Sequence, residues 1–363
     1  ADVPGSMPLS RTLAEEGLVI APTFVIKAGV VVVEAMQMLR GLDGSDTVGD
    51  FAAQISSVKV GVARLQQLLR QYTTSGFREG IDEMNAYAER LAQARLAEIP
   101  PGTYHFADVM DDDGCGTFDV RLEVAVTVTD AGIDVNFAGT SEVVAGNINC
   151  PISVAAAAVF YCFRCLLPDH TPACAGTFRR ISIRAPQGCL VNAERPAATA
   201  AGNVETSSRI VDVVLGALAL ALPAAIPAAS QGTMNNVAMG NHQRNRVWDY
   251  YETIGGGTGA HQRGGGLSGV QSHMTNTLNT PIESLEMHYP IRIREYAIRR
   301  RSGGAGQQPG GDGLIRTFEF LDRAEVTLLT ERRRHRPWGL AGGRPGMAGQ
   351  NLLDGEPLPP KCH

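Results

Sequence analysis

Lysine is scarce in this chain, and none lies between Lys59 and Lys361. A phosphate-binding loop of the GxxxxGK[S/T] type needs a lysine directly after its glycines, so that interval holds no ATP site of this type. Charged residues make up only 19% of the chain and the net charge is −5 at pH 7, which excludes the broad basic surface typical of nucleic-acid-binding proteins.

Long apolar runs are also missing. A membrane helix needs roughly 20 apolar residues, but the best candidate, 210–222, contains Asp212 and ends before Pro223. The N-terminal residues ADVPGSMP have neither the basic nor the apolar region of a signal peptide. We therefore expect a cytoplasmic protein.

Cysteine is present in an odd number, seven, at irregular spacing. Cys162 and Cys165 form a CxxC, but they lie inside an apolar helical pattern. Cys174 and Cys189 do not provide the second pair that a zinc site requires. We expect reduced thiols.

Glycine, in contrast, is concentrated in residues 252–290, where clusters at 255–259 and 264–266 precede a polar run, SHMTNTLNT. Glycine costs folding entropy, so such clusters indicate a sharply turning backbone or one that lies close to a ligand or another chain. No helical pattern follows GGGTGAHQRGGG, which argues against a dinucleotide fingerprint. A long surface loop remains possible, but His261, His273 and the polar run favour a functional loop.

Hydrophobic periodicity predicts two helices over 47–99, with Ile55, Val58, Val62, Leu65 and Leu69 on one face of the first. Gly76 is expected to separate them. After Pro100–Gly102 the period changes to two, and a turn at 130–132 indicates a β-hairpin. Further expected elements are helices at 152–167 and 207–222, strands at 179–186, at 247–253 and as one strand through FEFLDRAEVTLLTE, and glycine-rich loops.

The predicted fold is therefore α+β: a helical hairpin followed by a mixed β-rich body with glycine-rich loops. Three regions are expected: an extended N-terminal segment (1–46), the helical hairpin (47–99) and the mixed body (100–363).

Two acidic features need interpretation. Three adjacent aspartates in a strand cannot all face one cation, so we expect Asp111, Asp112 and Asp113 to form a solvated turn. Thr206 and Ser207 are natural N-cap residues, which would place Glu205 and Asn203 at the positive end of the following helix. Glu205 is then either a cap partner or a group next to a site.

Several long blocks, spread over almost the whole chain, resemble the hydantoinase B/oxoprolinase family, the B subunits of ATP-dependent cyclic-amide hydrolases, with relatives among acetone and acetophenone carboxylases. The blocks include PPGTYHFADVMDDDG (100–114), AGNVETSSRIVDVVLGAL (201–218), YYETIGGGTGA (250–260), SHMTNTLNTPIESLE (272–286) and PWGLAGGRPGMAGQNLL (337–353).

The resemblance implies a partner, a hydantoinase A-type subunit that binds ATP and phosphorylates the amide or enol oxygen. The B subunit would then process the activated intermediate, with a divalent metal (Zn or Mn) or a base activating water. Family members commonly carry H-x-x-D-x-G-G before P-G-S, whereas only Asp2 of that motif remains here. We expect Asp2 to be the remnant of a metal site, and the chain to be a fragment or a truncated paralogue.

The leading hypothesis is a B-type subunit of an ATP-dependent hydrolase of hydantoin-, 5-oxoproline- or lactam-like cyclic amides. The alternatives are a ketone carboxylase subunit and a non-catalytic scaffold. The candidate catalytic residues are His273, because histidine titrates near neutral pH, with His261 and Glu205. The candidate substrate-binding residues are Asn203, Glu252, Thr275, Asn276, Gly256 and Gly257. Arg332, Arg333 and Arg334 are candidates for contact with the partner subunit.

Overall fold

The computed structural model describes residues 46–241 and 247–363. The extended N-terminal segment and Asp2 lie outside this range. The chain divides into two compact units, Ala1–Ala88 and Glu89–His363. The boundaries of the three expected regions remain predictions.

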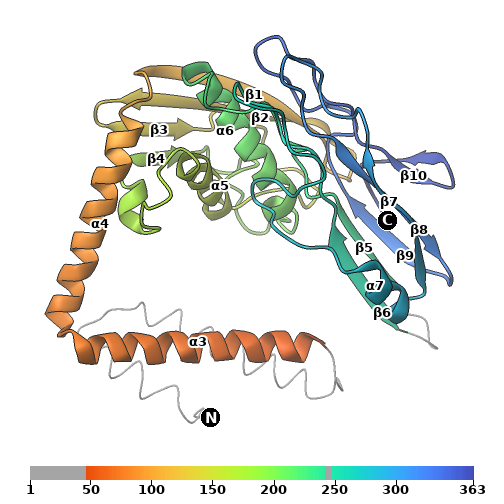
Figure 1. Ribbon diagram of the computed structural model, residues 1–363, viewed down its shortest axis with the longest axis horizontal. Coiled ribbons are helices and arrows are strands. Elements are labelled where there is room, and N and C mark those ends of the chain that lie inside the picture. The colour runs from red at the N-terminus through yellow and green to blue at the C-terminus, as the bar shows by residue number, and fades with distance from the viewer. Residues whose placement is uncertain (1–45, 242–246) are drawn as a thin grey trace. The chain divides into compact units, whose positions relative to one another are not determined.

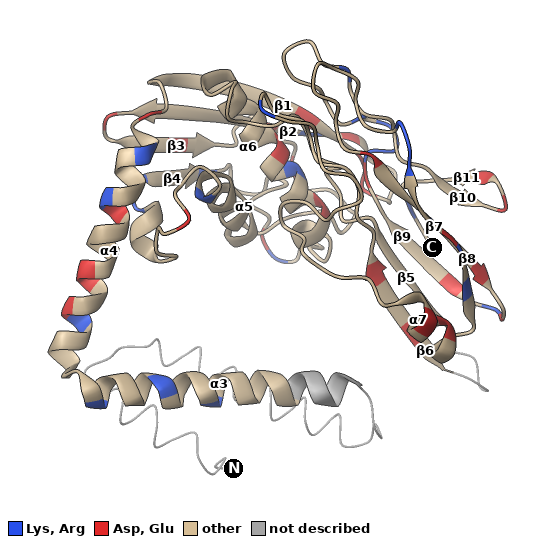
Figure 2. Ribbon diagram, in the orientation of Figure 1, with Lys and Arg blue, Asp and Glu red and all other residues tan. Residues whose placement is uncertain are grey.

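The first unit contains helix α3 (Asp46–Gln71) and most of helix α4 (Thr74–Leu96). Both predicted helices are confirmed, but the break between them falls at Thr73 rather than at Gly76. The hydroxyl oxygen of Thr73 accepts a hydrogen bond from the Gly76 N–H at 3.2 Å, which is the geometry of a helix N-cap. Helix α4 carries both acidic and basic residues along its length (Figure 2).

The second unit begins with a four-stranded sheet in the order β1–β2–β3–β4, formed by β1 (Gly102–Asp112), β2 (Phe118–Thr129), β3 (Gly132–Asn136) and β4 (Ile181–Arg184). The expected hairpin between β2 and β3 is confirmed, and β4 pairs parallel to β3. Along β2 the apolar positions of the alternating pattern are buried, as a half-covered sheet requires.

Two apolar helices, α5 (Ile152–Arg164) and α6 (Ser207–Ala221), pack together beside this sheet (Figure 1). Every residue of α6 from Ser207 to Ala219 is buried, so α6 is a central core helix rather than an amphipathic one. A short 3-10 helix (Ala175–Phe178) precedes β4. The main hydrophobic core lies between the sheet and these helices.

The start of α6 differs from the prediction. Residues Gly202–Thr206 form a π-helical turn that runs directly into α6, and Thr206 has helical backbone angles with no capping hydrogen bond. Its hydroxyl donates instead to the Ile148 carbonyl. The expected N-cap is therefore wrong, because the π-helical turn continues through Thr206. The Thr206 hydroxyl makes a tertiary contact, and the Ser207 hydroxyl donates to the Asn203 carbonyl one turn earlier.

The rest of the unit is β-rich. A second four-stranded sheet has the order β12–β9–β5–β6, with β5 (Asn236–Asn241), β6 (Trp248–Thr253), β9 (Glu325–Leu329) and β12 (Lys361–Cys362). Helix α7 (Ile282–His288) and the hairpin of β7 (Ile291–Arg299) and β8 (Gly313–Phe320) share a second, smaller core with it. Strands β10 (Asn351–Leu353) and β11 (Glu356–Leu358) form a small hairpin.

One predicted strand is in fact two. FEFLDRAEVTLLTE crosses from β8 to β9, which belong to different sheets, because residues 321–324 break the extended chain. The α+β prediction itself is confirmed.

Candidate functional site

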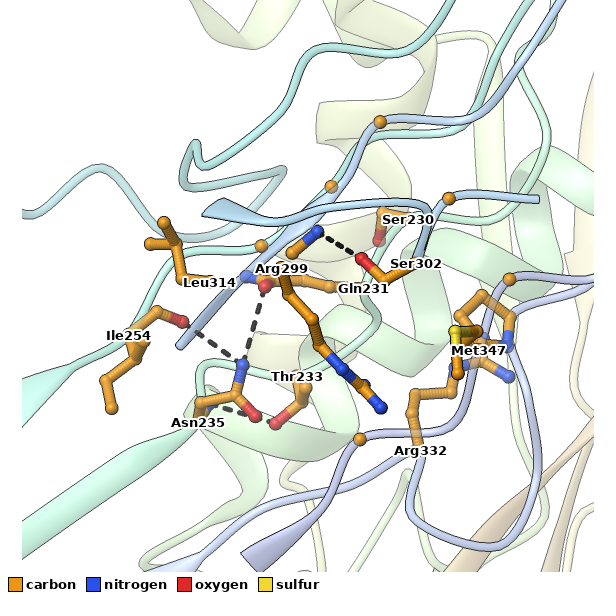
Figure 3. A pocket seen from close by; sticks show the side chains of 18 of the residues that line it. Ser230, Gln231, Thr233, Asn235, Ile254, Arg299, Ser302, Leu314, Arg332 and Met347 are labelled. Atoms are coloured by element: carbon orange, nitrogen blue, oxygen red, sulfur yellow. Dashed lines mark hydrogen bonds between the residues drawn. The ribbon is translucent and has the colours of Figure 1, made fainter. Parts of the chain in front are cut away.

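The second unit contains a large open cavity with a volume of about 1620 Å³. Four loops contribute to its wall, within residues 228–235, 254–262, 302–311 and 337–347, together with residues of β7, β8 and β10. Figure 3 shows part of this wall, including the side chains of Gln231, Thr233, Asn235, Arg299 and Leu314. Of the glycine-rich stretch singled out in the sequence, residues 254–262 line the cavity, whereas the second glycine cluster and the polar run do not.

The glycines of these loops are explained by close packing of backbone on backbone. A Cβ atom on Gly257 would meet the carbonyl oxygen of Gly311, and one on Gly259 would meet that of Ala228, both far inside the 3.0 Å that real Cβ contacts respect. A Cβ on Gly256 would overlap the Gln231 side chain. The cause at these positions is close approach to another part of the same chain, which differs from the sharp turn, ligand or second chain expected from the sequence.

The floor of the cavity is a short segment ahead of β5 whose side chains are held by hydrogen bonds. The Asn235 amide donates to the Ile254 carbonyl at 3.1 Å and to Gln231 Oε1 at 3.4 Å, and the Asn235 N–H donates to the Thr233 hydroxyl at 3.0 Å (Figure 3). Ser230 donates from its N–H and its hydroxyl to Asp212 Oδ1. The floor is therefore fastened to helix α6.

A network of buried charges lies behind this floor. Arg332, 2% exposed, makes ion pairs with Asp212 at 2.6 Å and Asp108 at 2.9 Å. Arg209 on α6 contacts Glu331 at 3.1 Å, and Lys361 on β12 makes an ion pair with the same carboxylate. The network joins β1, α6, β12 and the segment after β9.

The aspartate run is part of this buried region, and the expected solvated turn is wrong. Asp111, Asp112 and Asp113 are at most 4% exposed. Asp111 accepts hydrogen bonds from the backbone N–H groups of residues 333–335, and Asp113 accepts from those of Cys115, Thr117 and Gly146. Hydrogen bonds from backbone N–H groups offset most of the free-energy cost of burying a carboxylate. The sequence of three aspartates does not show that these donors are present.

Glu205 is fully buried. Its Oε1 accepts a hydrogen bond from the Met234 N–H at 3.1 Å and from the Asn236 amide at 2.7 Å, while its Oε2 has no partner in the described part of the chain. Burial raises the pKa of Glu205 to about 7, an effect opposed by the Thr233 hydroxyl and Lys361. A carboxyl group with a neutral pKa can both hold and release a proton near physiological pH.

His273 lies next to the charge network rather than on the cavity wall. Its Nε2 is 3.8 Å from Asp212 Oδ1 and its Nδ1 is 3.4 Å from the Tyr161 hydroxyl. Burial lowers the pKa of His273, and Asp212 opposes the shift. The backbone has φ +55° there, an uncommon value for a residue other than glycine. Thr275 is buried close by in sequence, and its hydroxyl has no partner among the described residues.

The other predicted site residues are dispersed. His261 is exposed and, like Gly256 and Gly257, lines the cavity. Glu252 is buried in a two-pronged ion pair with Arg316, at 3.0 and 3.2 Å, and also accepts from Tyr250 and Asn279. Asn203 and Asn276 are exposed. Of the predicted set, only His261, Gly256 and Gly257 line the cavity directly, and all catalytic and binding roles remain predictions.

Several residues of the cavity and its buried support were not singled out from the sequence as site residues: Asp108, Arg209, Asp212, Asn235, Arg299, Glu331 and Lys361. One signal was available, since charged residues inside the apolar pattern of α6 need partners when buried. Arg332, expected to meet a partner subunit, is buried and paired with Asp212, whereas Arg333 is half-buried on the cavity wall and donates to Asn351. Contact of Arg333 and Arg334 with a partner remains a prediction. Arg334 is exposed.

A divalent metal was expected from the resemblance. Across residues 46–241 and 247–363, no group of three or more His, Cys, Asp or Glu side chains is arranged to hold a metal ion. The described residues therefore do not fit a divalent metal ion, and no chemical step is derived through one.

Within the same residues, no helix is long and apolar enough to cross a bilayer.

Comparison with known proteins gives consistent results. The family model for hydantoinase B/oxoprolinase matches residues 1–362. The chain is 35% identical to 5-oxoprolinase 1 of Arabidopsis thaliana over 96% of its length, covering 29% of that protein. It is 34% identical to the 5-oxoprolinase of Dictyostelium discoideum, with 96% of this chain and 27% of that protein covered. The chain thus spans less than a third of the length of these relatives.

Solved structures show the same fold. The crystal structure of the ATP-dependent caprolactamase from Pseudomonas jessenii aligns with a TM-score of 0.73 and 24% identity, over 85% of this chain and 58% of that one. The nucleotide-free structure of an acetone carboxylase aligns with a TM-score of 0.67 and 17% identity, over 79% and 41%. At these identities the likeness is one of fold alone. With its whole length matched by one family and about a third of its residues shared with 5-oxoprolinases, the chain belongs to the hydantoinase B/oxoprolinase family.

Proposed function

We propose that this chain is part of the B-type component of an ATP-dependent hydrolase of cyclic amides, and that it processes an intermediate phosphorylated by a separate A-type component. The observation that carries the proposal is the similarity to 5-oxoprolinases over 96% of the chain. The scarcity of lysine, with none between Lys59 and Lys361, agrees with ATP being bound elsewhere.

The chemistry sets the requirements for such a component. Phosphorylation makes the oxygen of a lactam a leaving group, so that water can attack the imidate-like carbon. The site must take a proton from that water and stabilise the developing charge. His261, on the cavity wall, is the proton-transfer candidate that a ligand in the cavity can reach directly.

Glu205 and His273 are placed differently. Glu205 is linked to the floor through Met234 and Asn236, and His273 through Asp212 and Ser230. We propose that they act through these groups on the cavity floor, as positioning residues or proton stores.

The test is ATP-dependent turnover by the native assembly that contains this chain, with 5-oxoproline, hydantoin and caprolactam as substrates. We expect ring opening coupled to ATP hydrolysis and independent of bicarbonate. Activity that appears only with a ketone and bicarbonate would favour the carboxylase alternative. Full activity of the remaining components after removal of this chain would favour the scaffold.

A matched pair of variants tests the role of His261. His261→Gln should lower kcat by about 10²-fold or more if the imidazole transfers a proton. His170→Gln, an exposed histidine away from the cavity, should leave kcat unchanged. Equal activity of both variants would remove His261 from the mechanism.

A further inference from the structure

Six arginines line the cavity, and three of them, Arg299, Arg333 and Arg344, have no ion pair with a carboxylate of the described residues. Two of these three, Arg299 and Arg333, also lie near enough for their charges to interact. Arg299, at the end of β7, and Arg333, after β9, both line the cavity. Arg299 reaches across it from the side of Leu314 and Ser302 toward Thr233 and Arg332 (Figure 3).

All hydrogen-bond partners of Arg333 are neutral. Its Nε and Nη2 donate to Asn351 Oδ1 at 3.0 and 2.8 Å, and its Nη1 donates to Asn235 Oδ1 at 2.6 Å and to the Glu331 carbonyl at 2.7 Å. These bonds fix the plane of the guanidinium. They use four of its five N–H groups, which leaves one on Nη2.

Arg299 is held more loosely. Its Nη1 donates to the Ala348 carbonyl at 2.7 Å, and its Nη2 lies 3.4 Å from Gln350 Oε1. Within the described residues, no carboxylate oxygen lies within ion-pair distance of Arg299 or Arg333. Most of the N–H groups of Arg299 are therefore free for another acceptor.

Three other arginines of the same cavity are matched. Arg294 pairs with Glu319 at 2.6 Å, Arg316 with Glu252 at 3.0 Å, and Arg332 with Asp212 at 2.6 Å. The absence of a carboxylate contact at Arg299 and Arg333 is thus not a general property of the cavity.

Arg299 and Arg333 also act on each other. Burial lowers the pKa of Arg333 to about 10, the more distant Glu205, Asp111 and Glu331 oppose the shift, and the charge of Arg299 adds to it. Arg333 is only half-buried, and these carboxylates offset part of its charge without contacting its guanidinium. A bound anion at this place would therefore interact favourably with both cations.

A third donor lies at the same corner. The Gln231 side chain accepts from Asn235 through Oε1, and its Nε2 is buried with no acceptor in the part of the chain described. Asn235 is also the residue that accepts from Arg333. A buried donor without a partner is uncommon in a folded protein and points to a missing acceptor.

We propose that Arg299, Arg333 and the Gln231 amide form an oxyanion-binding subsite of the cavity. Planar guanidinium groups suit carboxylate and phosphoryl oxygens, because each can donate two parallel N–H groups. The proposal rests on the proposed function. The oxyanion belongs either to a carboxylate carried by the cyclic amide or to the phosphoryl group of the activated intermediate.

The test is calorimetric titration of the native assembly without ATP, using three probes. 5-Oxoproline and 2-pyrrolidinone share the lactam ring and differ in the carboxylate, and inorganic phosphate represents the phosphoryl group. Selective binding of 5-oxoproline over 2-pyrrolidinone assigns the subsite to a substrate carboxylate. Binding of phosphate, with no preference between the lactams, assigns it to the phosphoryl group.

Arg299→Gln should weaken binding of the preferred anion by about tenfold or more, and Arg299→Lys should recover part of that loss. Arg294→Gln is the matched control, because it removes one positive charge from the same cavity where Glu319 already pairs with it. It should change the affinity less than twofold.

Anion affinity that is unchanged in Arg299→Gln, or lowered equally by Arg294→Gln, overturns the subsite. Because no ATP turnover is measured, the two proposals fail separately. Ring opening without an Arg299-dependent anion site would support the proposed hydrolase function and contradict the proposed subsite. Arg299-dependent phosphate binding without ring opening would support the subsite and contradict the hydrolase function.

Discussion

Glu205 is a fully buried carboxyl group with one oxygen hydrogen-bonded and the other without a partner among the described residues. Burial raises its pKa in the folded protein to about 7, from the value of 4.5 that is ordinary for a glutamate in an unfolded chain. Between these pH values the folded state holds more protons than the unfolded chain. The contribution of protonated Glu205 to the free energy of unfolding is therefore fully present below pH 4.5 and is lost as the pH rises through 7.

Glu205→Gln should remove this dependence, because glutamine does not ionise. The free energy of unfolding of the variant, relative to the native protein, should rise by up to about 3 kcal/mol from pH 4.5 to 7.5. Urea denaturation at several pH values measures it. Glu319→Gln, which replaces a half-buried carboxylate whose pKa is lowered by Arg294, serves as the control. Parallel pH profiles for the native protein and Glu205→Gln would contradict the assignment.

Neighbouring arginines should differ sharply in their effect on stability. Arg332→Met removes the closest cation of Asp108 and of the buried Asp212, leaving Arg209 3.6 Å from Asp108 and His273 3.8 Å from Asp212. It should lower the free energy of unfolding by about 3 kcal/mol. Arg334 is exposed, with Asp119 3.4 Å away, so Arg334→Met should cost less than about 1 kcal/mol. Denaturation curves of the two variants give the comparison. A small effect for Arg332→Met would show that the buried aspartates find other partners.

At the scale of elements, the glycine-rich loops behave as a packed layer rather than as flexible connections. Gly257 and Gly311 touch backbone to backbone, and so do Gly259 and Ala228. Each contact leaves no space for a side chain. The cavity wall therefore depends on glycine for close approach, and its shape is set by contacts between loops far apart in sequence.

Two glycine-to-alanine substitutions distinguish the effect of close packing on stability from the effect of glycine on conformational entropy. Gly257→Ala should destabilise the protein by about 1–3 kcal/mol, because the added methyl group collides with the Gly311 carbonyl. A Cβ added to Gly80 in α4 would have no atom within 4 Å, so Gly80→Ala should stabilise by about 0.5–1 kcal/mol through helix propensity. Thermal melting monitored by circular dichroism tests both signs. A neutral Gly257→Ala would mean that the loops can move apart.

At the scale of the whole molecule, the core protects its thiols. None of the seven cysteines is in a disulfide; Cys150, Cys162 and Cys189 are buried, whereas Cys115 and Cys165 are exposed. Desolvation raises the pKa of Cys165, which favours Cys115 as the more reactive of the two exposed thiols. Burial raises the pKa of Cys150 to about 12 and that of Cys162 well above its usual range. Thiolate is the reactive form, so burial and protonation both slow alkylation.

Iodoacetamide at pH 8 should therefore modify Cys115 first in the native protein, and should reach Cys150 and Cys162 only after denaturation. Mass spectrometry of peptides from native and urea-treated samples measures the order. Rapid native modification of Cys162 would contradict the packing of α5 against α6.

The elements that the sequence predicted well are those whose signal is local. The three- and four-residue spacing of apolar residues predicted α3. Alternating apolar residues predicted β2, and residues 130–132 predicted its turn to β3. Where the local signal competed with tertiary contacts, the prediction was wrong. Thr206 bonds to Ile148 instead of capping a helix, and the aspartate run is buried by backbone donors from residues 333–335.

The sequence by itself determined the family, the α+β class and most of the individual elements, because their patterns repeat within a few residues. Only the tertiary structure decided which groups meet. Arg332 and Asp212 are 120 positions apart, and Asp111 and Arg333 are 222 apart. Pairing over such separations is set by how α6, the two sheets and the glycine loops pack, and a single sequence carries no local signal for it.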